Sequence, residues 1–114
     1  MKTENELNLI LNNFIQNKTT EIKKENNLEI KEDTDIILHH FLKIIREISY
    51  MDLKRKIKFF KEIIDIRLTE ANIYCDHFEK EKLEYPEICK KFPNYYMECQ
   101  KKFYTELNNI FINF

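Results

Sequence analysis

The sequence predicts an all-α protein: a small antiparallel bundle of about four helices, in a single domain that spans residues 1–114. Four segments carry apolar residues at intervals of three and four, the spacing of one helix face. No segment of useful length alternates apolar and polar residues as a half-buried strand does. The 114 residues also include no glycine, which disfavours tight β-hairpins.

The first helix is expected over residues 4–17. Thr3 followed by Glu6 has the pattern of a capping box, which starts a helix by satisfying its first backbone amides. An apolar stripe follows, made of Leu7, Ile10, Leu11, Phe14 and Ile15. The polar stretch 19–27 either continues this helix as an exposed turn or frays into a linker.

The second and third helices are expected over residues 34–50 and 52–80. Asp33 or Thr34 caps the second helix, and its apolar stripe is Ile37, Phe41, Ile44, Ile45 and Ile48. Ser49 with Asp52 marks the next start. The third stripe consists of Leu53, Ile57, Phe60, Ile64, Ala71, Tyr74 and Phe78.

Two prolines separate the third helix from the last one. Pro86 and Pro93 each lack a backbone donor and restrict the preceding residue, so they predict a short non-helical connection. Asn94 is the expected cap of a helix over residues 94–112. Its stripe comprises Tyr96, Cys99, Phe103, Leu107, Ile110 and Phe114.

The net charge of −1 hides blocks of opposite sign. Residues 36–67 hold eight Lys and Arg against four acids, whereas residues 68–88 hold two against six. Within the basic block, Lys54, Lys58 and Lys61 lie on one helix face with Arg55 beside them, and we call these four residues the basic ridge. The last helix adds Lys101 and Lys102. We predict that these six residues bind phosphate or an acidic partner, the alternative being an ordinary solvated surface.

The aromatic content is high, with nine Phe and six Tyr. Tyr95, Tyr104, Phe111 and Phe114 lie on or beside the last stripe, and we expect them to contact a partner, with Tyr95 and Tyr104 exposed. Tyrosines among lysines suit stacking on unpaired bases. In the alternative interpretation these side chains simply close the end of the bundle.

Several chemistries are disfavoured by the residues present. Without glycine there is no P-loop, Rossmann turn or nucleophile elbow. Ser49 is the only serine, and no carboxylate lies in an apolar run that would raise its pKa, so we expect no catalytic site. His39, His40, His77 and the three cysteines are metal-ligand types, but their spacing matches no zinc motif, and we expect neither metal nor cofactor.

Cys75, Cys89 and Cys99 leave two alternatives open. Cys99 lies on an apolar stripe and is expected to be a buried free thiol. In an oxidising compartment, Cys75 pairs with Cys89 or Cys99 instead. The acidic, polar N-terminal residues do not have the pattern of a signal peptide, and no apolar run has the length of a membrane span, so a cytoplasmic location is expected.

Together these features predict a non-catalytic helical interaction protein. It is expected to act as a small accessory or regulatory factor that docks on the protein subunits of a larger assembly. A ribonucleoprotein such as the ribosome is the expected assembly, with RNA meeting the lysine face. The alternatives are an exported helical surface domain stapled by one disulfide, and a helical enzyme or metal protein without a recognisable motif.

Overall fold

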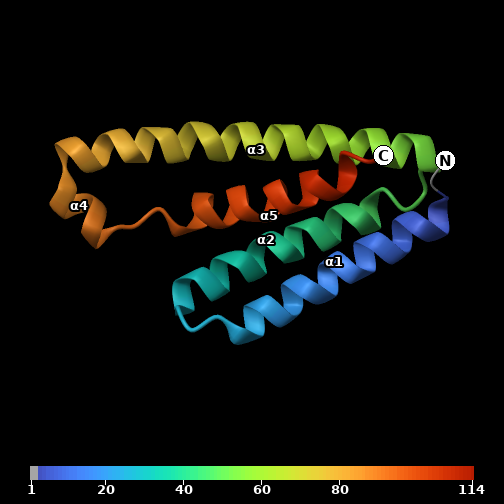
Figure 1. Ribbon diagram of the computed structural model, residues 1–114, viewed down its shortest axis with the longest axis horizontal. Coiled ribbons are helices and arrows are strands. Elements are labelled where there is room, and N and C mark those ends of the chain that lie inside the picture. Colours follow the sequence, from blue (N-terminus) through green and yellow to red (C-terminus); the bar gives the residue numbers. More distant parts are fainter. Residues whose placement is uncertain (1–2) are drawn as a thin grey trace.

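The computed structural model describes residues 3–114 and shows five helices and no strand within that range (Figure 1). The prediction of an all-α bundle is confirmed. The helices are α1 (Glu4–Lys24), α2 (Leu28–Glu47), α3 (Leu53–Glu84), α4 (Pro86–Lys91) and α5 (Tyr95–Phe111). Four of them match the expected helices, and α4 is additional.

The first two helices meet at a three-residue connection, not at a long linker. At the start of α1, the Thr3 hydroxyl accepts a hydrogen bond from the Glu6 amide at 3.1 Å, as the capping box predicts. The helix passes the expected end at residue 17 because Lys18 and Ile22 are both buried. The start of α2 is capped by Asn27, whose side chain accepts hydrogen bonds from the amides of the second and third helical residues, so the expected cap at residues 33 and 34 is wrong.

The start of α3 agrees with the sequence, whereas the segment between the prolines does not. The Asp52 carboxylate accepts a hydrogen bond from the Arg55 amide at 2.9 Å. Beyond α3 we expected a non-helical connection, but Pro86 begins α4. A proline is favourable there because the first helical residue has no partner for its amide and its fixed φ already suits the helix.

Aromatic rings at the centre of the bundle join all four long helices. Phe41 of α2 is fully buried, and its ring centroid lies 5.6 Å from that of Phe103, 5.9 Å from Phe60 and 6.2 Å from Phe14. Helix α5, which carries Phe103, runs between α2 and α3 (Figure 1). The hydrophobic core therefore depends on contacts between residues far apart in the sequence.

The molecule is elongated, with extents of 50 × 27 × 22 Å. At one end the Lys56 ammonium lies 2.5 Å from the Glu4 carboxylate and ties the start of α3 to the start of α1. At the other end, α4 and the last turns of α3 project past the hairpin of α1 and α2 (Figure 1). We call residues 72–92 the arm. It includes Tyr74, predicted to lie on the buried stripe but in fact 55% exposed.

None of the helices within residues 3–114 is long and apolar enough to cross a membrane.

Candidate functional site

The basic ridge lies near the start of α3, on the side that faces away from the core. Phe60 and Ile64 point into the bundle, and the four ridge residues on the other sides of the helix are exposed. Lys54, Lys58 and Lys61 border a shallow hollow on α3 that Ile57, Glu62 and Asp65 also line. The predicted spacing thus places three ammonium groups around one surface depression.

The charge of the ridge is little offset within the chain. From residue 54 to residue 61 the sequence holds five cations and no acid. Lys56 pairs with Glu4, and the Arg55 Nε lies 3.8 Å from an Asp52 oxygen. Within the described part of the chain, Lys54, Lys58 and Lys61 form no ion pair. Three cations therefore remain for an external anion.

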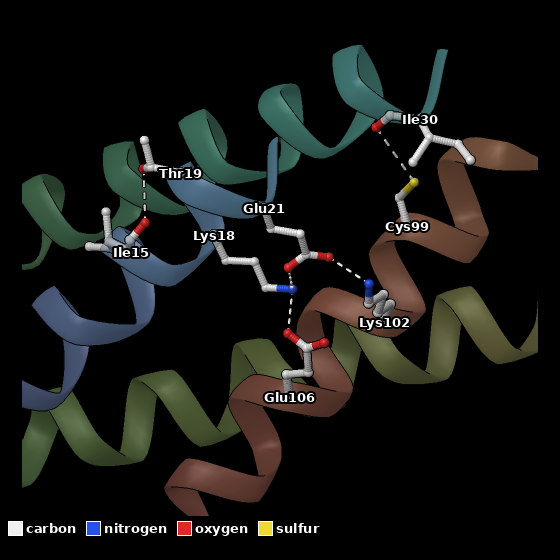
Figure 2. A network of polar contacts seen from close by, with 8 residues as sticks. All are labelled: Ile15, Lys18, Thr19, Glu21, Ile30, Cys99, Lys102 and Glu106. Atoms are coloured by element: carbon white, nitrogen blue, oxygen red, sulfur yellow. Dashed lines mark hydrogen bonds and ion pairs between the residues drawn. The ribbon is translucent and has the colours of Figure 1, made fainter. Parts of the chain in front are cut away.

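The two lysines predicted on the last helix do not join the ridge. The Lys102 ammonium lies 2.5 Å from the Glu21 carboxylate of α1, and this hydrogen bond raises the pKa of Lys102 (Figure 2). Lys101 is exposed and lies close enough to Cys75 for its charge to act on that thiol. Cys75 is fourteen residues beyond Lys61 on α3, about 21 Å along the helix axis.

Lys102 belongs to a polar network that sequence reasoning missed. Lys18 of α1 is only 2% exposed, and its ammonium pairs with Glu106 of α5 and, at 3.0 Å, with Glu21 (Figure 2). The ammonium also lies 5.7 Å from the centre of the Phe103 ring. Burial alone would raise the pKa of Glu21, but hydrogen bonds from Lys102 and Lys18, with their charges, lower it. The network binds α1 to α5.

Two of the four predicted contact aromatics belong to the core. Tyr104 is 2% exposed and Phe111 is 1% exposed, so the expectation that they contact a partner is wrong. Tyr104 packs beside Phe103 and Phe41, and burial raises the pKa of Tyr104 to about 12. Phe111 packs on Phe60. Tyr95 and Phe114 are half-buried.

Other large apolar side chains are strongly exposed, several of them in the arm. Leu83 is 88% exposed, and Phe92 and Ile88 are 65% and 59% exposed; all three belong to the arm. Tyr50, in the connection between α2 and α3, is 80% exposed. Apolar periodicity did not predict this distribution, because it identifies a helix face without showing whether another helix covers it.

A second polar cluster lies where α2, α3 and α5 meet. His40 of α2, Arg67 and Glu70 of α3, and Gln100 and Tyr104 of α5 line one cleft. Gln100 is 3% exposed, and its amide nitrogen donates to the Glu70 carboxylate at 2.8 Å and to the Arg67 carbonyl at 3.0 Å. The available signal in the sequence was a glutamine on an apolar stripe, four residues after Tyr96 and four before Tyr104.

The cysteines and histidines do not assemble into a metal site. Within residues 3–114, no three His, Cys, Asp or Glu side chains come together as ligands of one ion would. All three cysteines are free, Cys89 being buried and the other two half-buried. The Cys99 thiol faces the Ile30 carbonyl of α2, whereas Cys75 faces the Asn94 side chain.

Comparisons with protein-family models, with curated proteins and with solved structures find no match for this chain. The basic ridge and the polar cleft are therefore identified by their geometry and chemistry alone.

Proposed function

We propose that the protein is a non-catalytic interaction factor that docks on a ribonucleoprotein, with the basic ridge against RNA phosphates. The observation that carries this proposal is the set of three exposed lysines, Lys54, Lys58 and Lys61, which form no ion pair in the described chain even with the two acids that border the same hollow. Phosphate contacts by lysine release counterions and supply affinity that does not depend on sequence. The ridge occupies a single helix, so the spacing of its lysine residues along the backbone is set before binding.

The rest of the surface favours a role within a larger assembly over independent RNA binding. The whole chain has a net charge of −1, whereas isolated RNA-binding domains are usually basic. Arm residues such as Leu83 and Phe92 expose apolar area that suits contact with protein subunits. A factor of this kind touches RNA on one side and protein on another.

The direct test is RNA binding measured by fluorescence anisotropy with a labelled single-stranded RNA at several salt concentrations. Three phosphate contacts predict that log K falls against log salt with a slope of about −2. Replacing Lys54, Lys58 and Lys61 by Glu should abolish binding and leave the helical circular dichroism unchanged. The control replaces the exposed Lys80, Lys90 and Lys91 by Glu, which changes the net charge equally.

Equal loss of binding in the ridge variant and in the control would assign the affinity to net charge and reject the ridge. Absence of binding by the unmodified protein, both to free RNA and to ribosomes in a sedimentation assay, would reject the ribonucleoprotein itself.

A further inference from the structure

We infer that the cleft between α2, α3 and α5 binds a small carboxylate that carries a short apolar tail. The cleft has a volume of about 180 Å³. This is below the range of drug-sized sites, roughly 300 to 1,000 Å³, but exceeds several times the space of one water molecule. Its size therefore fits a ligand of a few heavy atoms.

Arg67 is the group in the cleft that selects an anion. A guanidinium offers five N–H donors in a planar fork that matches a carboxylate. Only its Nη1 atom pairs with an acid in the described chain, at 3.5 Å from the Glu70 carboxylate. Tyr104 lines the same cleft, and the charge of Arg67 acts on its hydroxyl group. The remaining guanidinium donors are available to a ligand.

Glu70 and Arg67 offset each other's charge, so the ligand is attracted by the unpaired N–H donors of the guanidinium and not by a net positive charge. The Gln100 amide nitrogen donates to the Glu70 carboxylate at 2.8 Å, and Arg67 pairs with the same oxygen. The Gln100 amide nitrogen also donates to the Arg67 carbonyl, which fixes the orientation of the amide. The buried Gln100 thus hydrogen-bonds both the Glu70 carboxylate and the backbone carbonyl of Arg67.

Further donors converge on the cleft from two other helices. The rings of Tyr96 and Tyr104 line it from α5, and His40 lines it from α2. Burial raises the pKa of Tyr96, and the positive charge of Arg67 opposes this rise. Polar side chains that converge from separate helices of a rigid scaffold are typical of ligand-binding sites.

The apolar wall of the cleft specifies the rest of the ligand. Ile37 and Ile44 of α2 line the same space as the polar groups. A carboxylate at Arg67 would therefore place a short aliphatic chain against these two isoleucines. Phosphate and sulfate satisfy the arginine but leave the apolar wall uncovered, so they are expected to bind less well than a fatty acid of about four carbons.

The test uses the full chain and a titration with butyrate at constant ionic strength, followed by amide chemical shifts. We expect saturable shifts at α2, α3 and α5 residues around the cleft, and a rise in melting temperature with butyrate. Butyramide, the neutral analogue of the same shape, should produce neither.

N-acetylvaline presents a carboxylate as a polypeptide C-terminus does. Tighter binding of N-acetylvaline than of butyrate would indicate a partner's chain end, and the reverse order would indicate a free acid.

Arg67→Lys keeps the charge but removes the fork, and should weaken butyrate binding at least about tenfold. Arg46→Lys, at an exposed position of α2 outside both the cleft and the basic ridge, is the matched control and should bind as the unmodified protein does. Tyr96→Phe, which removes one hydroxyl and keeps the ring, should weaken binding about threefold and serves if Arg67→Lys does not fold. Equal responses to butyrate and butyramide, or unchanged affinity in both cleft variants, would overturn the inference.

Discussion

The body of the bundle is the part outside the arm, where the four long helices pack together. Both regions consist of amphipathic helices, but they differ in whether other helices cover the apolar faces. In the body, Phe41 is surrounded by aromatic rings from three other helices. Beyond Ala71, no residue of α3 is buried, and within the arm only Cys89 is. An apolar stripe is therefore buried only where other helices pack on both of its flanks. Within the arm, α3 and α4 contact each other.

The largest difference between the two regions should appear when one ring is removed from each. Phe41→Ala leaves a cavity enclosed on all sides and should lower the free energy of unfolding by about 3 to 5 kcal/mol. Phe78→Ala, at a half-buried arm position, should lower it by only about 1 kcal/mol. Urea denaturation followed by circular dichroism measures both. Similar losses would mean that the arm is packed as tightly as the body.

The polar network of the body predicts a pH dependence. The pKa of Glu21 lies below its ordinary value of 4.5, so ionised Glu21 stabilises the fold above that pH. This stabilisation is lost as the pH falls through the lowered pKa. Glu21→Gln should therefore cost about 1 kcal/mol at pH 7 and progressively less below pH 4.

The control for this experiment is Glu62→Gln on the outer side of α3, an exposed acid without an ion pair in the described residues. It should change stability little at either pH. A constant difference between Glu21→Gln and the unmodified protein from pH 7 to pH 3 would contradict the role assigned to the network.

The smallest effects concern the three thiols, two of which lie in the arm and one in the body. Burial raises the pKa of Cys75 in the arm and of Cys99 in the body above the ordinary 9.0. Less thiolate is then present at any pH, so iodoacetamide should alkylate both more slowly than a free cysteine derivative, and faster as the pH rises above 9. The buried Cys89 should react last.

In guanidinium chloride the three thiols should become equally reactive. A cysteine that stays protected there until a reductant is added would reveal a disulfide, and would support the exported, stapled form of this domain.

The fold was largely predictable, and the errors have a common physical cause. Thr3 and Asp52 cap helices as their patterns indicate, because capping depends on local hydrogen bonds. Apolar periodicity predicts an early end for α1 because a lysine, Lys18, occupies a core position after Phe14. Only the tertiary structure shows that Glu21 and Glu106 compensate its charge.

The two candidate sites also differ in whether local sequence patterns can predict them. The basic ridge lies on a single helix, so the spacing of its lysines was sufficient to place it. The cleft combines His40, Arg67 and Gln100 from three helices, and no interval in the sequence relates them. Tyr104 and Phe111 were predicted to contact a partner but are buried. Apolar residues on a helix face do not by themselves show whether another helix covers that face.

The position of α5 has a consequence for synthesis of the protein. This helix follows the other four in the chain yet supplies Phe103 and Leu107 to the centre of the core. The ring of Phe14 packs against that of Phe103, which lies 89 residues later in the sequence. While the chain emerges from the ribosome, α1, α2 and α3 present unfilled apolar faces, the condition in which nascent chains bind chaperones. The core is complete only once α5 has left the ribosome.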